Sequence, residues 1–215
     1  MKTHEQGFFI TFEGPEGAGK SSQIRMLEAA LTAAGRQVLT TREPGGTPLA
    51  EEIRELVKNH RFSEPVHPVT ELLLMEAARC QHVAEVIAPA LREGKIVLCD
   101  RFFDSTTAYQ GGGRGLESGT VAQLNRFAAL SVVPDLTILL DLPPERGFDR
   151  ASRRVETQGE YDRFEAETLA FHRRVHDAFV AISRKDPGRV KVVDADRDRE
   201  SVHREILELV DGLVR

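Results

Sequence analysis

Residues 14–21 read GPEGAGKS, and this short stretch decides the fold class that the rest of the chain is expected to follow. Gly14, Gly19, Lys20 and Ser21 fill the pattern G-x-x-x-x-G-K-[ST], between a β-like run and a helical pattern. Glycines allow successive N–H groups to turn inward at a helix N-terminus, where the partial positive charge of the helix favours phosphate. The stretch therefore predicts a loop that binds a nucleoside triphosphate together with Mg²⁺.

Each position of this phosphate loop has an expected task. Lys20 is expected to reach the β- and γ-phosphates, and the Ser21 hydroxyl is expected to ligate Mg²⁺. The whole loop and the start of the following helix are expected to surround the triphosphate; these residues are Gly14, Pro15, Glu16, Gly17, Ala18, Gly19, Lys20, Ser21 and Ser22.

Outward from the loop, strand-like and helix-like patterns alternate along the chain. Helical periodicity places Ile24, Leu27 and Leu31 on one face, and Gly35 follows where a C-terminal capping glycine is expected. The alternation predicts an α/β fold: a three-layer, doubly wound sheet of five parallel strands that binds its ligand at their carboxyl ends. The expected strands are Phe8–Phe12, Val38–Thr41, Ile96–Cys99, Leu136–Leu140 and Val190–Val193.

Composition and charge narrow the class of protein. The 215 residues include 29 Lys+Arg and 34 Asp+Glu, and the net charge of −5 disfavours a long nucleic acid as partner. The length fits one domain, residues 1–215. No apolar run approaches the roughly 20 residues that cross a bilayer, and the charged N-terminus does not resemble a signal peptide. We expect a cytoplasmic protein, without a membrane partner, in which Cys80 and Cys99 stay reduced.

Charged side chains stand where the expected strands end. Arg42 and Arg101 each follow a β-like run, and guanidinium groups suit bidentate capture of phosphate, although either one alone is more often a surface arginine. Asp100 and Asp141 also end apolar runs, so both are candidates for holding Mg²⁺ or its waters, and Asp100 is favoured. The sequence lacks the N-K-x-D and D-x-x-G segments of GTPases, which favours a small enzyme that transfers a γ-phosphoryl group.

Two segments depart from the alternation. Residues 110–115 read QGGGRG, and glycines at this density indicate a backbone that turns sharply or approaches a ligand closely. Residues 149–165 read DRASRRVETQGEYDRFE, a charged run interrupted by Gly159. Taken alone, such a run is most often a solvated surface turn.

The segments FEGPEGAGKS, TREPGGT, AARCQ, DRFFDSTTAYQGGGRG, PDLTILLD and DRFE, in this order and spacing, resemble the thymidylate kinase family in its bacterial form. The resemblance covers about residues 7–212. It implies a P-loop nucleoside monophosphate kinase fold and transfer of the γ-phosphoryl group of MgATP to dTMP, giving dTDP and ADP in dTTP synthesis. It also implies a homodimer. A general base is not required, because a monophosphate with a second pKa near 6 is already nucleophilic at neutral pH.

The resemblance assigns roles around dTMP. In this family the arginines at the positions of Arg42 and Arg101 hold the acceptor phosphate, and the acidic loop residue, here Glu16, lies near the sugar 3′-hydroxyl. The position of Arg79 binds thymine O4, and that of Tyr109 selects deoxyribose. The resemblance thus places the following residues around dTMP: Glu16, Arg42, Met75, Arg79, Arg101, Thr106, Tyr109 and Gln110.

The charged run corresponds to the family's mobile lid, at about residues 149–165. Gly17 stands where some relatives carry an arginine inside the phosphate loop, so Arg153 or Arg154 is expected to supply that charge as the lid closes. The expected catalytic residues are Lys20, Asp100, Arg101, Arg153 and Arg154, with Ser21 and Asp100 as the Mg²⁺ ligands.

Met75 departs from the family, which has a phenylalanine stacked on thymine at this position. Met75 and Arg79 are four residues apart and share a helix face, and a thioether packs acceptably on a ring. The alternative is that Met75 is a core residue beside Leu72 and Val83. For the function, the alternatives are a P-loop kinase with another acceptor and a regulatory nucleotide-binding protein without turnover.

Overall fold

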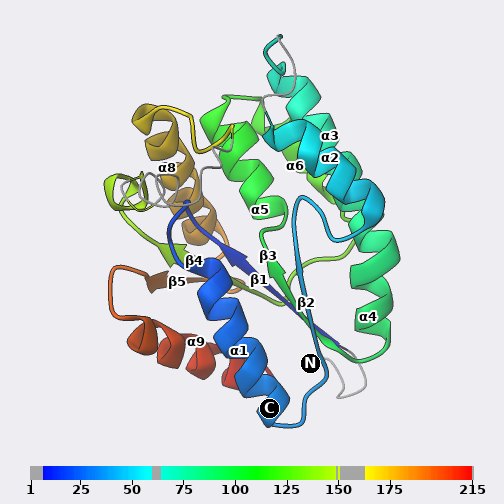
Figure 1. The fold of residues 1–215 in the computed structure, drawn as a ribbon, viewed down its shortest axis with the longest axis vertical. Helices are drawn as coiled ribbons and strands as arrows, with labels where there is room; N and C mark the ends of the chain where they lie inside the picture. Colours follow the sequence, from blue (N-terminus) through cyan, green and yellow to red (C-terminus); the bar gives the residue numbers. More distant parts are fainter. Residues whose placement is uncertain (1–6, 60–63, 149, 151–162, 215) are drawn as a thin grey trace.

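The computed structural model describes residues 7–59, 64–148, 150 and 163–214, and its centre is a single five-stranded sheet (Figure 1). The strands are all parallel and lie in the order β2-β3-β1-β4-β5. They are β1 (Phe8–Glu13), β2 (Val38–Arg42), β3 (Ile96–Asp100), β4 (Leu136–Asp141) and β5 (Val190–Asp194). The predicted doubly wound α/β fold is therefore confirmed.

Each strand extends one residue beyond the apolar run that predicted it. The additional residues are all charged: Glu13, Arg42, Asp100, Asp141 and Asp194. Apolar patterning reports burial of side chains, whereas a strand continues as long as its backbone stays paired. The register pairs Arg42 with Asp100, and Asp141 with Asp194. Charged side chains therefore line the carboxyl edge, where a doubly wound sheet binds its ligand.

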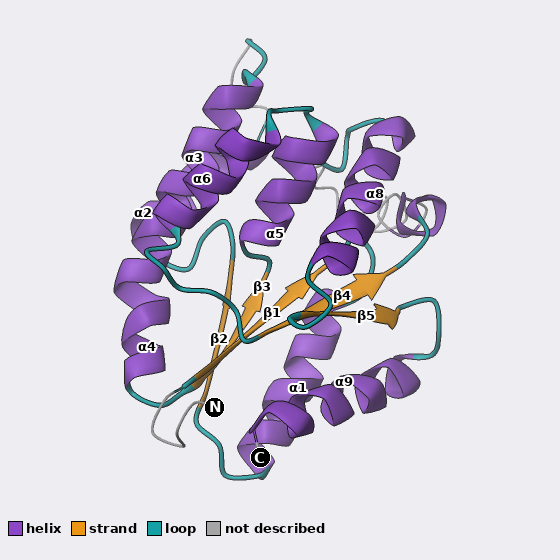
Figure 2. Ribbon diagram, turned by 180° about the vertical axis from the view of Figure 1, so that it is seen from behind, coloured by secondary structure: helices purple, strands orange, loops and turns teal. Residues whose placement is uncertain are grey.

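Helices cover both faces of the sheet, which makes three layers (Figure 2). On one face α1 (Lys20–Ala33) and α9 (Arg199–Val214) bury Leu27 and Ile206 against strand residues such as Ile10. The opposite side holds α2 (Pro48–Lys58), α3 (Pro68–His82), η1 (Val83–Ile87), α4 (Ala88–Arg92), α5 (Phe103–Thr106), η2 (Thr107–Gly113), α6 (Ser118–Ala128) and α8 (Leu169–Lys185). Residues 144–148 are also helical. Within the described ranges, no helix has the length and apolarity to cross a membrane.

The ends of α1 follow the sequence prediction. The helix begins at Lys20, after Gly19 in a left-handed conformation with φ 89°. At the other end Gly35 has φ 76°, and its N–H donates to the carbonyl of Thr32 while the N–H of Arg36 donates to Leu31. The expected capping glycine is therefore confirmed, and it closes α1 before β2.

The glycine-rich residues 110–115 contain a turn at Gly115, with φ 74°, and two close contacts with a neighbouring helix. A Cβ on Gly112 would lie 2.6 Å from the Cβ of Ala178, and a Cβ on Gly113 would lie 2.5 Å from the ring of Phe171. Both neighbours belong to α8. These two glycines are required because the π-helical segment η2 packs closely on α8.

Gly112→Ala is expected to lower the free energy of unfolding by about 1–3 kcal/mol, because the added methyl group overpacks the contact with Ala178. Gly111→Ala is the matched control, since a Cβ at Gly111 meets no atom within 4 Å. Urea unfolding of both variants measures the difference. Equal stability of the two variants would contradict the packing of η2 on α8.

Candidate functional site

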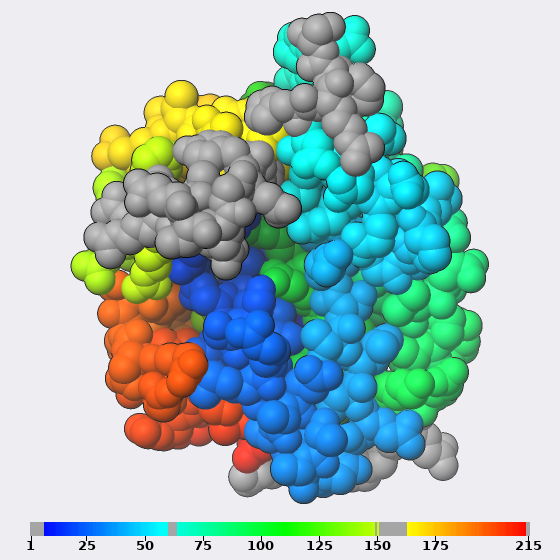
Figure 3. Space-filling model, in the orientation of Figure 1, coloured from blue at the N-terminus to red at the C-terminus, as the bar shows by residue number. Residues whose placement is uncertain are grey.

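A cleft of about 880 Å³ opens at the carboxyl edge of the sheet, a size that suits a small-molecule ligand. The surface is hollowed between the blue residues of the phosphate loop and α1 and the cyan residues of α2 (Figure 3). The predicted residues that line it are Glu16, Gly17, Gly19, Lys20, Ser21, Ser22, Arg42, Met75, Arg79, Asp100, Arg101, Thr106, Tyr109 and Gln110. Gly14, Pro15 and Ala18 are not among the lining residues, and Arg153 and Arg154 lie outside the described residues.

The phosphate loop wraps around the side chain of Lys20. Its Nζ donates hydrogen bonds to the carbonyls of Gly14, at 3.1 Å, and Pro15, at 2.9 Å. A Cβ on Gly14 would lie 2.4 Å from the carbonyl oxygen of Leu140, so the loop can cross β4 only with glycine there. Burial, followed by the charge of Arg101, lowers the pKa of Lys20. The ammonium group is thus already inside the loop that would surround a phosphate.

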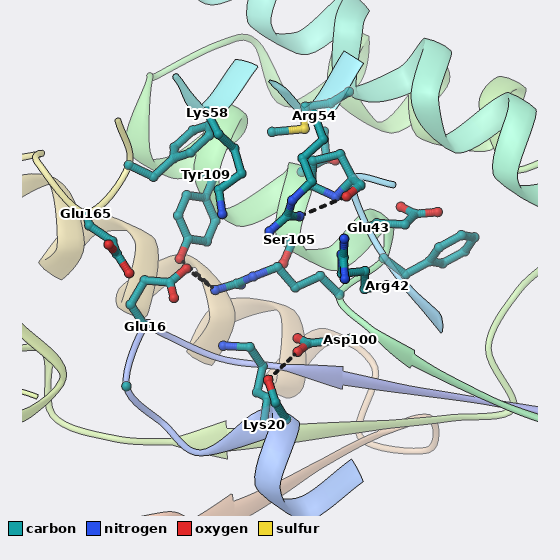
Figure 4. A pocket seen from close by; sticks show the side chains of 18 of the residues that line it. Glu16, Lys20, Arg42, Glu43, Arg54, Lys58, Asp100, Ser105, Tyr109 and Glu165 are labelled. Carbon is teal, nitrogen blue, oxygen red and sulfur yellow. Dashed lines mark hydrogen bonds and ion pairs between the residues drawn. The ribbon is translucent and has the colours of Figure 1, made fainter. Parts of the chain in front are cut away.

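The two predicted Mg²⁺ ligands lie in contact. Ser21 Oγ donates to Asp100 Oδ2 over 3.0 Å, at the end of β3 (Figure 4). Among the described residues no group of three or more His, Cys, Asp or Glu could hold a metal by itself. A hydroxyl and one carboxylate nevertheless fit Mg²⁺, which usually completes its coordination with phosphates and water. The rival Asp141 is not a lining residue of the cleft and pairs with His176 at 2.7 Å.

Arg101 stands between the phosphate loop and the opposite wall. Its guanidinium donates to the Gly14 carbonyl at 3.0 Å, Glu16 Oε1 at 2.6 Å, Ser105 Oγ at 3.0 Å and the Tyr109 hydroxyl at 3.2 Å. Its backbone has φ 73°, an uncommon and costly conformation for a residue with a side chain. A strained backbone conformation persists only where surrounding contacts stabilise it, and the four hydrogen-bond partners of the Arg101 side chain provide such contacts.

Glu13 stabilises the turn that follows β3, at residues 101–105, and the sequence analysis did not identify it as a site residue. Its buried Oε1 accepts from the N–H groups of Phe102, at 2.8 Å, and Ser105, at 3.3 Å. The Ser105 hydroxyl donates to Oε2 at 2.5 Å. Burial and the nearby charge of Asp104 raise the pKa of Glu13 to about 8, against the opposing effect of Arg101. A charged residue at the end of an apolar strand was the available signal.

Arg79 is buried at the far wall with its charge compensated. Nε donates to Glu43 Oε2 at 2.8 Å, and Nη1 donates to Glu76 Oε2 at 2.9 Å and to Asn125 Oδ1 at 3.0 Å. Nη2 donates to Thr106 Oγ1 at 2.8 Å. These bonds use four of the five guanidinium N–H donors. The fifth makes no bond to the described residues, and Arg79 lines the cleft.

The other predicted substrate residues contribute different kinds of surface. Arg42 is half exposed at the rim and donates to Glu51 Oε2 at 2.9 Å. Met75 lines the cleft and packs, partly buried, against the apolar cluster that includes Val57, a cluster to which neither Leu72 nor Val83 belongs. Gln110 is almost fully buried.

Several lining residues were missed: Glu43, Pro44, Arg54, Glu55, Lys58, Asn59, Phe102, Ser105, Arg150, Phe164 and Glu165. Figure 4 shows Arg54 and Lys58 reaching into the cleft from α2. They are four residues apart and so share one face of that helix, but the spacing alone does not show that this face meets the cleft. Arg150 and Glu165 stand at the two ends of the charged run and line the cleft even though most of that run lies outside the described residues.

Known proteins share this architecture and sequence. The family model for thymidylate kinase matches residues 12–206. The thymidylate kinase of Trichlorobacter lovleyi is 51% identical over 189 residues, which cover 87% of this chain and 89% of that protein. The thymidylate kinase of Pseudomonas fluorescens is 50% identical over 208 residues, 97% of each chain. The crystal structure of thymidylate kinase from Ehrlichia chaffeensis matches with a TM-score of 0.76 and 34% identity, covering 95% of this chain and 99% of that one.

The raised pKa of Glu13 predicts a stability that falls as pH rises. The folded chain keeps the Glu13 proton up to about pH 8, whereas the unfolded chain releases it near 4.5. Between these values the folded state binds more protons, so one such group lowers the free energy of unfolding by up to about 1.4 kcal/mol per pH unit.

Glu13→Gln does not titrate, and its amide oxygen keeps the acceptor for the N–H groups of Phe102 and Ser105, whereas the bond with the Ser105 hydroxyl reverses, so that the amide donates to Ser105 Oγ. Urea unfolding between pH 5 and 8 should show a smaller loss of stability in this variant than in the unmodified chain. Other titrating groups are the same in both proteins. Parallel curves would show that Glu13 is ionised throughout this range.

Proposed function

We propose that the cleft at the carboxyl edge of the sheet is the site of phosphoryl transfer. The chain belongs to the thymidylate kinase family and transfers the γ-phosphoryl group of ATP to dTMP, giving dTDP and ADP. The observation that carries the assignment is the position of Arg101, which contacts both the phosphate loop and Tyr109 on the opposite wall. A donor in the loop and an acceptor beside Tyr109 would present their phosphates to the same guanidinium.

The reaction requires positioning and charge neutralisation more than proton transfer. The acceptor oxygen of dTMP is mostly deprotonated at neutral pH, since the second pKa of a phosphate monoester lies near 6. Lys20 and Arg101 would neutralise the charge that spreads over the transferring group. Both are buried or nearly so, and removal of water strengthens their electrostatic effect.

For the donor, we propose that residues 14–22 surround the triphosphate of ATP and that Lys20 moves from the Gly14 and Pro15 carbonyls to the phosphates. Ser21 and Asp100 would hold Mg²⁺ directly or through its waters, because their oxygens are adjacent and of the type that this ion prefers. Bound Mg²⁺ would supply positive charge at the β- and γ-phosphates.

For the acceptor, we propose that Arg42 and Arg101 hold the phosphate of dTMP, and that Arg54 at the same rim assists them. Arg54 Nη1 donates to the Pro44 carbonyl at 2.8 Å, which fixes the side chain beside the cleft (Figure 4). Guanidinium groups suit this task because their planar donors match phosphate oxygens in pairs. Glu16 would lie near the sugar 3′-hydroxyl.

The remaining residues would recognise thymine and deoxyribose. The fifth N–H of Arg79 is the proposed donor to thymine O4, with Thr106 and Gln110 close by and the Met75 thioether against the ring. Tyr109 would crowd the 2′ position. Its hydroxyl is held by Arg101, so the ring cannot easily turn away from an added ribose hydroxyl.

The charged run would act as a mobile lid of a single domain, residues 1–215, and Arg153 or Arg154 would complete the charge around the transferring phosphoryl group. In support, the described residues at the two ends of the run already line the cleft. Arg150 Nη1 donates to the Gly17 carbonyl at 3.3 Å. Gly17 is the loop position without an arginine side chain, so the lid would supply the charge that the loop lacks.

We also propose a cytoplasmic homodimer that uses the exposed apolar face of α3 and α6. These helices pack together, and the side chains of Leu73 and Phe127 are 52% and 79% exposed. Light scattering is expected to give about 48 kDa, twice the chain mass of 23.9 kDa. Phe127→Glu should shift the protein toward monomer, while Val192→Glu, at an exposed position of β5, should not. A monomeric parent protein would reject the proposal.

An ADP-release assay with a panel of nucleoside monophosphates tests the function and its site. The chain is expected to prefer dTMP, and Lys20→Ala and Arg101→Ala should each lower kcat by about 10²–10⁴-fold, because each removes a charge that stabilises the transition state. Arg184→Ala is the matched control, since Arg184 is an exposed arginine in the last turn of α8. Its kcat should stay within about twofold of the parent value.

Two results would overturn the assignment of the site. Preference for UMP or AMP over dTMP would show that the pocket around Arg79 and Met75 does not select thymine. Near-normal kcat in both Lys20→Ala and Arg101→Ala would show that the transfer takes place elsewhere.

A further inference from the structure

Glu71 is a fully buried carboxylate on the same face of α3 as two cleft residues. Glu71, Met75 and Arg79 follow one another at intervals of four, so their side chains share one side of the helix. Met75 and Arg79 line the cleft, but Glu71 does not. Its exposed fraction is 0%, and a charge without water must be compensated by the protein.

Three side chains compensate this carboxylate. Oε1 accepts from Gln110 Nε2 at 2.8 Å and from Arg114 Nε at 3.1 Å. Oε2 accepts from Arg114 Nη2 at 3.1 Å and from Arg163 Nη2 at 2.5 Å. One carboxylate therefore ties α3 to η2 and to the segment that begins at Arg163.

The partners of Glu71 lead directly to the cleft. Gln110 lines it, and so do Phe164 and Glu165, which follow Arg163 in the chain. Arg163 is held further at the end of α2, where its backbone N–H donates to the Lys58 carbonyl at 3.0 Å. Glu71 thus contacts one lining residue, Gln110, and the arginine that precedes two others.

These lining residues belong to the acceptor end of the cleft. The ring of Phe164 meets the ring of Tyr109 edge to face, with 5.8 Å between centroids. Arg163 lies over the ring of Phe164, with its guanidinium carbon 4.8 Å from the ring centroid. Glu71 has no hydrogen bond to residues 14–22 of the phosphate loop among the described contacts.

We propose that Glu71 is a positioning residue for dTMP: it holds Gln110 directly, and Phe164 and Glu165 through Arg163, in the places from which they line the acceptor end of the cleft. The proposal rests on the proposed use of that cleft for dTMP. A loss of Glu71 should therefore weaken the use of dTMP and leave the use of ATP nearly unchanged.

The test compares Glu71→Gln with Glu167→Gln in steady-state kinetics of the full chain. Glu71→Gln keeps the shape of the side chain but removes its charge and puts an amide donor among the N–H groups of Arg114 and Arg163. The KM for dTMP is expected to rise at least tenfold, with the KM for ATP within twofold.

Glu167 is the matched control because it is the other carboxylate partner of Arg114 and has no hydrogen bond to Gln110 or Arg163 among the described contacts. Glu167→Gln should leave both KM values within twofold. An equal rise of the dTMP KM in both variants would overturn the proposal, because loss of charge at Arg114 would then explain it. An equal rise of both KM values in Glu71→Gln would overturn it too, as a sign of general loosening.

Two further measurements keep the result interpretable. Circular dichroism identifies a Glu71→Gln chain that does not fold. Arg163→Lys then replaces it, because lysine keeps the charge but has one terminal nitrogen, which cannot replace both the Nη2 bond to Glu71 and the Nε bond to the Val57 carbonyl. Arg163→Lys should raise the dTMP KM selectively, and an unchanged KM would overturn the proposal. The parent protein is assayed in parallel, so that absence of dTMP turnover there counts against the function and not against Glu71.

Discussion

The guanidinium of Arg101 joins the two halves of the cleft, because its hydrogen bonds reach the Gly14 carbonyl on one side and the Tyr109 hydroxyl on the other. The backbone at φ 73° aims this side chain across the edge of the sheet, in a direction that ordinary strand and helix conformations do not give. Glu13 stabilises the turn by accepting two N–H groups that follow it. The phosphate loop, β3 and η2 therefore have fixed positions relative to one charge.

Positive charge is concentrated in the cleft of a chain whose net charge is −5. The buried arginines are each paired with acids: Arg79 with Glu43 and Glu76, and Arg101 with Glu16. Burying an unpaired guanidinium would lower the free energy of unfolding by several kcal/mol. Because these carboxylates compensate the charge, the arginines can stay at the cleft without a bound anion. Part of the acidic excess is thus internal counter-charge for the site. The net charge disfavours a long nucleic acid as partner but does not describe the electrostatic potential inside the cleft.

Sequence patterns predicted the strands, the helix after the phosphate loop and the loop itself, but only some of the residues that line the cleft. Five apolar runs gave the five strands, but their charged last residues were left out, since hydrophobicity does not report backbone pairing. Ser21 and Asp100 could be paired because each stands at a recognisable position, at a loop end and a strand end. Arg54 could not be assigned in this way, because only the folded chain shows which face of α2 meets the cleft. The contact of Gly112 with Ala178 could not be predicted, since glycine density alone does not show which neighbour lies close to the backbone.

The sheet order has a consequence for how the chain acquires its site. β1 carries the first described residues, yet its two neighbours are β3 and β4, so Ile10 pairs with Leu98 and Leu136. Pairing across such long chain segments is slow, because the entropy of closing each loop is lost before the contacts form. Because β1 precedes β3 and β4 in the chain, it gains its second neighbouring strand only after residue 136 has been made. Gly14 of the phosphate loop, which lies against the Leu140 carbonyl, therefore lacks this support until β4 has paired with β1.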